Sequence, residues 1–197
     1  MREFKTEARL NKIITAVKNR QHSLSVVLEN VHDPHNVSAI LRTCDAVGIS
    51  KVSLVYNTEK FPKINRTSSS GAVKWVERQK FQSVKECYDN LHAQGFKIYA
   101  SSLTDHSISL YDIDFTQKVA VVLGNEHRGL SKEAADYADG VFLIPMHGMV
   151  QSLNVSVANA VVLYEAQRQR LLNGMYGKTE LDEKEIDKLI DEWCKKK

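Results

Sequence analysis

Residues 119–131 read VAVVLGNEHRGLS, and this stretch decides how the rest of the chain is interpreted. Its first five residues, Val119 to Leu123, are apolar throughout instead of alternating with polar residues. A strand of this kind is buried on both faces, which is typical of a parallel sheet covered by helices. Gly124 ends the apolar run, and the polar residues that follow predict a turn before a helix that Ser131 can cap.

On both sides of this stretch, short apolar runs alternate with segments of helical periodicity. Further strands are expected at residues 25–28, 52–56, 97–101 and 141–144, and helices at 36–48, 84–93, 131–138 and 152–172. We expect Asn36 and Ser152 to cap two of these helices, and Gly48 to end the first. The alternation predicts an α/β fold in which helices cover both faces of a parallel sheet. Ligands of such folds bind at the carboxyl ends of the strands.

The chain has 197 residues, which suits one domain with terminal helices better than two full domains. We expect a basic N-terminal helix at residues 1–20, the α/β domain at 21–173, and a tether with an amphipathic helix at 174–197. Residues 58–72 are polar and basic and predict a mobile loop that contains Ser68, Ser69 and Ser70.

Positive charge gathers in two segments of the chain. The formal net charge is only +3, yet residues 1–22 and residues 57–80 each carry six Lys or Arg against two Glu. Two basic segments on an acidic body suggest a surface that binds an anion such as a nucleic acid. On charge alone, a solvated helix face and a solubilising loop explain them at least as well.

Several functional classes are excluded by what the sequence lacks. It contains no GxGxxG dinucleotide fingerprint, no GxxxxGK[ST] phosphate loop and no GxSxG elbow. We expect no metal site, no membrane span and no signal peptide. The three cysteines are far apart and fit a reduced chain, so we expect the protein to be cytoplasmic.

Three polar segments carry the candidate chemistry. Arg42 lies off the apolar face of its helix, where it can contact phosphate or ribose or simply pair with Asp45 three residues on. Gly124 to Gly129 follows the most apolar strand, where free backbone groups can contact a ligand. Residues 145–154 combine a strand end, the flexible Gly148 and a helix N-terminus, which suits a polar or anionic group. Ordinary turns and helix caps would produce the same patterns.

Together these segments resemble a known family. Residues 27–49 (VLENVHDPHNVSAILRTCDAVGI), 121–131 (VVLGNEHRGLS) and 144–170 (IPMHGMVQSLNVSVANAVVLYEAQRQR) are similar to the three motifs of the SpoU class of SPOUT RNA 2′-O-methyltransferases. The likeness is strongest to the members of that class that modify tRNA.

The resemblance implies a SPOUT (alpha/beta knot) fold with a C-terminal trefoil knot, and an obligate homodimer with its active site at the interface. It implies transfer of a methyl group from S-adenosyl-L-methionine to the ribose 2′-hydroxyl of guanosine 18 in the tRNA D-loop. Arg42 matches the family's catalytic arginine. The residues that match its supporting polar positions are Asn36, Glu126, Ser152 and Asn154. Those that match positions lining the cofactor pocket are Ser101, Gly124, Ile144, Met146 and Leu153.

Two alternatives stay open from the sequence. One is a 2′-O-methyltransferase of the same class that acts on ribosomal RNA. The other is a catalytically silent RNA-binding module on the same fold. Ribosomal members of the class often carry a separate N-terminal RNA-binding domain, whereas only a helix of about 20 residues precedes the first motif here, which favours tRNA. The sequence does not decide whether Arg42 accepts the proton of the hydroxyl or only orients the ribose.

Overall fold

The fold is described from a computed structural model that covers residues 2–64 and 71–196. These residues form a seven-stranded parallel sheet in the order β3-β2-β1-β6-β4-β7-β5. The strands are β1 (Leu24–Glu29), β2 (Lys51–Val55), β3 (Glu77–Phe81), β4 (Lys97–Ser101), β5 (Ile108–Ser109), β6 (Val119–Leu123) and β7 (Gly140–Leu143). The predicted α/β fold is therefore confirmed.

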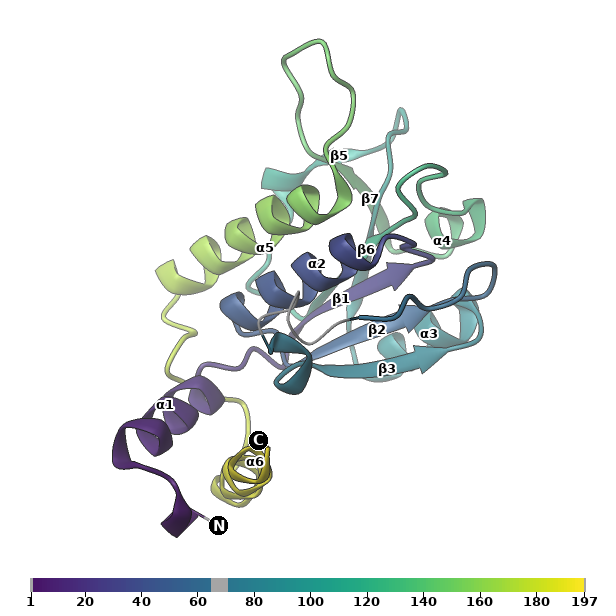
Figure 1. Cartoon of the computed structure of the whole chain (residues 1–197). Helices are drawn as coiled ribbons and strands as arrows, with labels where there is room; N and C mark the ends of the chain where they lie inside the picture. The colour runs from purple at the N-terminus through teal and green to yellow at the C-terminus, as the bar shows by residue number, and fades with distance from the viewer. Residues whose placement is uncertain (1, 65–70, 197) are drawn as a thin grey trace.

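Helices cover both faces of the sheet (Figure 1). The helices are α1 (Glu7–Lys18), α2 (Pro34–Val47), α3 (Val84–Ala93), α4 (Lys132–Asp136), α5 (Val155–Leu172) and α6 (Glu183–Lys195), and short 3-10 turns occupy Arg2–Phe4, Ala72–Lys74 and Leu110–Asp112. Val119, Val121 and Leu123 of β6 pack on the side of α2 and α5. Ala120 and Val122 of the same strand pack on the side of α3 and α4, so β6 is buried on both faces as expected.

Two helix starts differ from those expected from the sequence. Helix α2 is capped by the side chain of Asp33, and Asn36 lies inside its first turn. Helix α5 is capped by the side chain of Asn154, so Ser152 lies outside the helix. In each case two good capping residues stand close together in the sequence, and the local pattern does not tell which of them caps. Asn36 and Ser152 are thereby left available for other contacts.

Gly48 ends α2 as predicted, with a left-handed φ of 92°. A Cβ atom at this position would lie 2.7 Å from the backbone oxygen of Asn19, so the close approach of the two segments requires glycine. Strand β3 was not expected, because its residues are mostly charged or polar and largely exposed at the sheet edge. The predicted loop runs into the turn at Ala72–Lys74, and its residues 65–70 lie outside the described part of the chain.

The terminal helices pack against each other beyond the amino ends of the strands, where both chain ends lie (Figure 1). Ile13 and Val17 of α1 share one apolar cluster with Ile190, Trp193 and Cys194 of α6. The ring of Trp193 also contacts Trp75, with 4.8 Å between ring centroids. This cluster joins the two ends of the chain to the segment that precedes β3. None of the helices in the described residues is long and apolar enough to cross a membrane.

Candidate active site at the carboxyl ends of the strands

Glu126 lies in the turn after β6 and is held by three hydrogen-bond donors. Its carboxylate accepts the backbone N–H groups of His32 and Asp33 at 3.0 and 3.1 Å, and the side-chain amide of Asn36 at 3.0 Å. Partial burial disfavours its charge, but these three donors outweigh that cost and lower the pKa of Glu126 below its usual value of 4.5. The residue is therefore an ionised acceptor that ties the β6 turn to the start of α2.

Asn36 connects this carboxylate to α5. Its side-chain oxygen accepts a hydrogen bond of 3.1 Å from the amide of Asn154, whose own oxygen caps α5 by accepting from Ser156. Asn36 is buried, so the bonds at both ends fix the orientation of its amide. The chain Glu126–Asn36–Asn154 thus joins three segments far apart in the sequence, and it contains three of the five predicted catalytic residues.

Two adjoining cavities open beside these residues. One, of about 670 Å³, is lined by the strand ends of β4 and β7 and by the loop before α5, and it contains the predicted cofactor-binding residues Ser101, Ile144, Met146 and Leu153. The other, of about 530 Å³, is lined by Gly124, Glu126 and Asn154. Both are also lined by Ser101, Ser152 and Leu153. All five predicted cofactor-binding residues therefore come together around these cavities.

The turn that holds Glu126 has no room for a side chain at its first position. A Cβ atom on Gly124 would lie 2.5 Å from the backbone of Gly129, because residues 125 and 129 pair through two backbone hydrogen bonds of 3.0 and 2.9 Å. The tight turn therefore requires glycine at position 124, and it directs the side chain of Glu126 toward α2.

Two predicted catalytic residues, Asn36 and Arg42, line neither cavity. Asn36 is bonded to Glu126 and Asn154, which do line one, whereas Arg42 has no such link among the described residues. It is exposed, lies six residues after Asn36 in α2, and lines neither cavity. Six residues correspond to about 9 Å along a helix. The alternative pairing with Asp45 is wrong, because the carboxylate of Asp45 is engaged by Arg20. Among the described residues Arg42 forms no ion pair, so its guanidinium is available to another molecule.

Sequence reasoning missed several residues that shape this site. Asn30 and Asn125 bond the turns after β1, β2 and β6 to one another, and Arg128 pairs with Glu59 at 2.7 Å. An asparagine at the end of a predicted strand is a weak hint of a turn, and nothing in the local pattern indicates contacts 95 residues away. These residues became apparent only from the three-dimensional arrangement.

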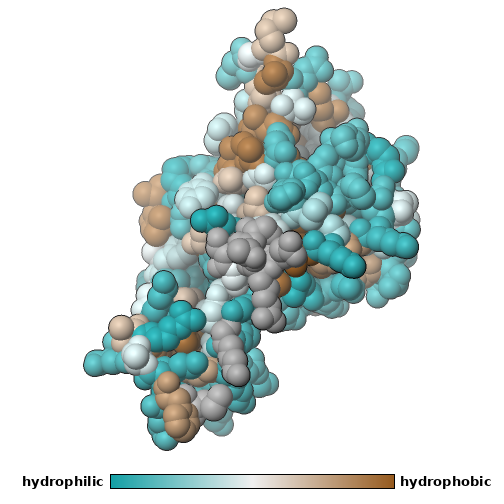
Figure 2. Space-filling model, in the orientation of Figure 1, coloured by the Kyte–Doolittle hydropathy of each residue, from teal (hydrophilic) through white to brown (hydrophobic). Residues whose placement is uncertain are grey.

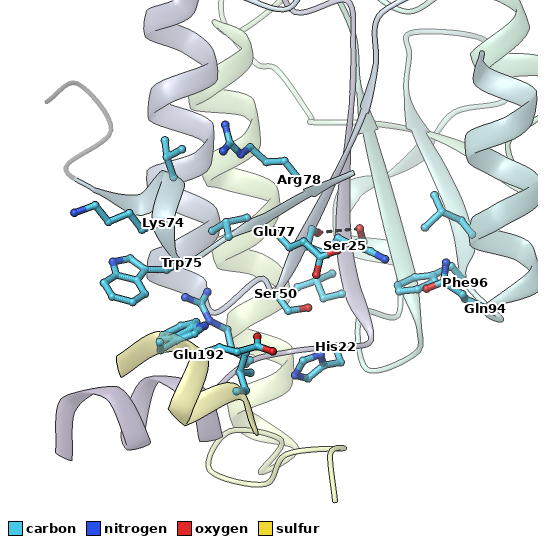
Figure 3. Close-up of a pocket in the computed structure, with 18 of the residues that line it drawn as sticks. His22, Ser25, Ser50, Lys74, Trp75, Glu77, Arg78, Gln94, Phe96 and Glu192 are labelled. Carbon is cyan, nitrogen blue, oxygen red and sulfur yellow. Dashed lines mark hydrogen bonds between the residues drawn. The ribbon is translucent and has the colours of Figure 1, made fainter. Parts of the chain in front are cut away.

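A third cavity, of about 580 Å³, lies at the opposite end of the sheet, and we call it the basic pocket. Figure 3 shows Lys74, Trp75 and Arg78 on one side of it and Gln94 and Phe96 on the other. Its acidic residues are Glu77 and Glu192, and its Lys and Arg residues are Arg20, Lys51, Lys74, Arg78, Lys118 and Lys196. Both basic segments of the sequence contribute cations to it.

Two buried nitrogen atoms in the basic pocket have no hydrogen-bond partner within residues 2–64 and 71–196. They are Nε of Arg20 and Nε2 of His22. Burial lowers the pKa of His22, which favours its neutral form. The pocket therefore concentrates positive charge and unused polar atoms, as an anion-binding surface requires. No cluster of three or more His, Cys, Asp or Glu able to hold a metal ion occurs in residues 2–64 and 71–196.

Comparison with known proteins relates this arrangement to a family of RNA methyltransferases. The tRNA (guanosine(18)-2′-O)-methyltransferase of Thermus thermophilus is 47% identical over 196 residues, which cover 100% of both chains. The crystal structure of the TrmH/SpoU tRNA modifying enzyme of Aquifex aeolicus superposes with a TM-score of 0.89 at 41% identity and 95% coverage of both chains.

A more distant structure contains a ligand. The SpoU methyltransferase AviRb of Streptomyces viridochromogenes, solved in complex with the cofactor AdoMet, has a TM-score of 0.68 at 27% identity and covers 77% of this chain and 59% of that one. The fold is the SPOUT fold, and the trefoil knot expected within it stays a prediction. The model of the SpoU rRNA methylase family matches residues 23–164, which contain every candidate residue of the site. With that match and full-length identity of 47% to one relative, the chain belongs to the SpoU rRNA methylase family.

Proposed function

We propose that this chain transfers a methyl group from S-adenosyl-L-methionine to the ribose 2′-hydroxyl of guanosine 18 in tRNA. The observation that carries the proposal is the junction Glu126–Asn36–Asn154 beside two adjoining cavities at the carboxyl ends of the strands. The reaction and the substrate are those that the name of the Thermus relative states, and that relative matches over its whole length.

The larger cavity suits the cofactor in size and chemistry. A volume of about 670 Å³ lies within the usual range of small-molecule pockets, roughly 300–1,000 Å³. Ile144, Met146 and Leu153 offer apolar surface for an aromatic base, while the hydroxyls of Ser101 and Ser152 offer hydrogen bonds to ribose or polar edges. We propose that these residues and Gly124 hold S-adenosyl-L-methionine. When bound, it supplies a methyl group on a positively charged sulfur, so no metal is needed to activate the group.

The chain's task is then to orient the 2′-oxygen and to assist the loss of its proton. The new bond forms between the 2′-oxygen and the methyl carbon as the carbon–sulfur bond breaks, and the hydroxyl proton leaves. Glu126 is not the proton acceptor in this proposal, because its carboxylate is already engaged by three donors. We propose that Glu126 holds Asn36 in place. Through Asn36 it also positions the N-terminus of α5, where Ser152 and Asn154 lie.

Arg42 is proposed to contact the ribose and its phosphate. A guanidinium presents five donors in a planar fork, which matches a phosphate better than a point charge does. A guanidinium gives up its proton far less readily than an ordinary general base, so two routes for the hydroxyl proton are considered. In one route burial and a neighbouring phosphate let Arg42 accept it transiently, and in the other Arg42 orients the ribose while a phosphate oxygen accepts the proton.

The functional unit in this proposal is a homodimer. Hydrophobic side chains gather along α5 and the loop above it (Figure 2). Exposed members of this surface are Met149, Val150, Val157, Tyr164, Leu171 and Leu172. A large exposed apolar surface of this kind indicates a protein interface. A second copy packed on α5 and α2 would bring one protomer's Arg42 to the other protomer's cavities, which completes a site that one chain leaves incomplete.

We further propose that residues 21–173 act as the methyltransferase domain, while the basic segment at residues 1–20 and the basic pocket hold the tRNA backbone. Contacts of this kind add affinity without reading bases. With tRNA as its substrate, we expect the protein to act in the cytoplasm.

Incubation with methyl-labelled S-adenosyl-L-methionine tests the proposal against its two rivals. Equal amounts of tRNA and of ribosomal RNA are offered in separate reactions that contain a chelator. The proposal expects label in tRNA and little in ribosomal RNA. Label confined to ribosomal RNA would favour the ribosomal alternative. RNA binding without any transfer would favour the silent module, and transfer that requires added zinc or magnesium would contradict the metal-free reaction.

A further inference from the structure

Asn30, the residue directly after β1, has an unusual backbone conformation. Its φ is 53°, and among the described residues no other residue except glycine has a positive φ. The left-handed region is unfavourable for most side chains, and asparagine is one of the few that tolerate it. The residue is buried, with 6% of its surface exposed. Glycine would fit this conformation more easily, so the side chain must contribute something that glycine does not.

The side chain of Asn30 organises the turn after β2. Its amide oxygen accepts the backbone N–H groups of Asn57, Thr58 and Glu59 at 3.2, 3.2 and 3.1 Å. Its amide nitrogen donates to the side-chain oxygen of Asn57 at 2.8 Å. Three successive N–H groups thus converge on one oxygen, and the turn wraps around the side chain.

The backbone of Asn30 reaches the turn that contains Glu126. Its carbonyl oxygen accepts a hydrogen bond of 2.8 Å from the amide of Asn125, and the oxygen of that amide accepts the backbone N–H groups of His127 and Arg128. Arg128 in turn pairs with Glu59 at 2.7 Å, which closes the network back onto the turn after β2. Both residues next to Glu126 in the sequence are therefore in this network.

The other side of Glu126 also depends on Asn30. The left-handed conformation turns the chain off the end of β1, and the next residues present the N–H groups of His32 and Asp33 to the carboxylate. We propose that Asn30 is a positioning residue for methyl transfer, which sets the distance between Glu126 and the start of α2 and so fixes the amide of Asn36. It touches no reacting atom in this assignment. The inference rests on the proposed function.

Three substitutions separate the contributions of Asn30. Asn30→Asp keeps an oxygen for the three N–H groups and tolerates the left-handed conformation. Asn30→Ser keeps a single shorter acceptor. Asn30→Gly keeps the conformation and the backbone carbonyl that accepts from Asn125, and loses every side-chain bond of Asn30. We expect kcat to be highest with Asn or Asp at position 30, lower with Ser and lowest with Gly. The kcat of Asn30→Gly should lie at least about tenfold below that of wild type, and the kcat of Asn30→Asp within about threefold of it. Cofactor affinity and the KM for tRNA should change less than kcat, because the cavities themselves are unaltered.

Asp114→Ala provides a matched control. Asp114 also accepts three hydrogen bonds in a loop, from the backbone and hydroxyl of Thr116 and from Gln117, but it precedes β6 at the amino end of the sheet. Thermal unfolding is measured for every variant, and kcat is measured at a temperature where each is folded. The control should lose stability without losing kcat.

The outcomes are distinct. If Asn30→Gly is folded and turns over at the wild-type rate, Asn30 is a structural residue and the inference is wrong. If Asn30→Gly does not fold, the kcat values of Asn30→Asp and Asn30→Ser are compared instead. A lower kcat in Asn30→Ser supports the inference, and equal values contradict it. If wild type itself transfers no methyl group to tRNA, it is the proposed function that fails. A loss of about tenfold in Asn30→Gly with the Asp variant intact supports the positioning role.

Discussion

At the scale of single residues, Arg42 and Glu126 are held in opposite ways. Glu126 is fixed by three donors from a neighbouring segment, whereas Arg42 is exposed and forms no ion pair among the described residues. A fixed carboxylate suits a group that organises the site, and an unengaged guanidinium suits a group that meets the substrate. Their roles should therefore separate cleanly in kinetics.

Replacement of Arg42 by alanine should abolish methyl transfer and spare the fold. Arg42 is exposed, so we expect a stability change within about 0.5 kcal/mol and unchanged cofactor affinity. A loss of about 100-fold or more in kcat corresponds to about 2.7 kcal/mol of transition-state stabilisation. Arg42→Lys should not restore the rate, because a point charge lacks the planar fork.

Single-turnover kinetics and calorimetric titration of the cofactor check this prediction, with Lys85→Ala on α3 as a control for loss of an exposed cation. A rise in the KM for tRNA alone would assign Arg42 to substrate binding. A wild-type rate in Arg42→Ala would remove it from the site altogether.

Replacement of Glu126 by glutamine should give a stability difference that depends on pH. The folded-state pKa of Glu126 lies below its usual value of 4.5, so the ionised carboxylate stabilises the fold above about pH 4.5. That contribution is lost as the pH falls through the lower, folded-state pKa. Wild type should therefore be more stable than Glu126→Gln near pH 7, and the two should converge under acid conditions.

Urea unfolding of the two proteins between about pH 3 and pH 7 provides the measurement. A stability difference that stays constant over this range would mean that the three donors do not favour the charged form. A loss of kcat in Glu126→Gln at neutral pH, with the protein folded, is expected in addition, because the amide of Asn36 loses a charged partner.

At the scale of elements, α5 is anchored at both ends by polar side chains. Asn154 caps its start, and Arg170 near its end is fully buried. All five donors of Arg170 are used, and their partners are the side chain of Gln21, both oxygens of Ser23, and the backbone oxygens of Phe115 and Gln117. Helix α5 is thereby bonded to the segment before β1 and to the loop before β6.

Arg170→Lys should destabilise the fold strongly. Lysine has three donors and cannot span these positions, so several buried acceptors would lose their partners at a combined cost of about 3 kcal/mol or more. Arg168→Lys on the same helix is the matched control, because the Arg168 side chain is 60% exposed and, in the part of the chain that the structure describes, bonds only Glu165. Chemical denaturation of both variants measures the difference. Equal stabilities would mean that the network around Arg170 contributes little.

The elements differ in how well the sequence predicts them. Strand β6 was predicted because its five residues are apolar and both of its faces are buried, so local pattern and tertiary environment agree. Strand β3 was missed because an exposed edge strand needs few apolar residues. The caps of α2 and α5 were assigned to the wrong polar residue, because each helix start offers two good capping residues within three positions of each other: Asp33 and Asn36, and Ser152 and Asn154. The role of Asn30 depends on partners up to 95 residues away, which no local pattern reveals.

At the scale of the whole molecule, the central question is whether one site uses two chains. Mixing two inactive variants, Arg42→Ala and Glu126→Gln, answers it. If Arg42 acts in the partner's site, half of the exchanged dimers are mixed and each has one intact site of two, so about a quarter of wild-type activity should return. If both residues act within one chain, every site of a mixed dimer carries one of the two substitutions. No activity then returns. Light scattering at low micromolar concentration should show a dimer for each variant.

The most direct test of the whole account uses a tRNA that differs by one atom. Two transcripts are prepared, one with guanosine and one with 2′-deoxyguanosine at position 18, and each is incubated with the protein, methyl-labelled S-adenosyl-L-methionine and a chelator. We predict that the first transcript gains label at nucleotide 18 alone and that the second gains none, because the accepting 2′-oxygen is absent. Label in the deoxy transcript, or label at another nucleotide of the first, would contradict the account.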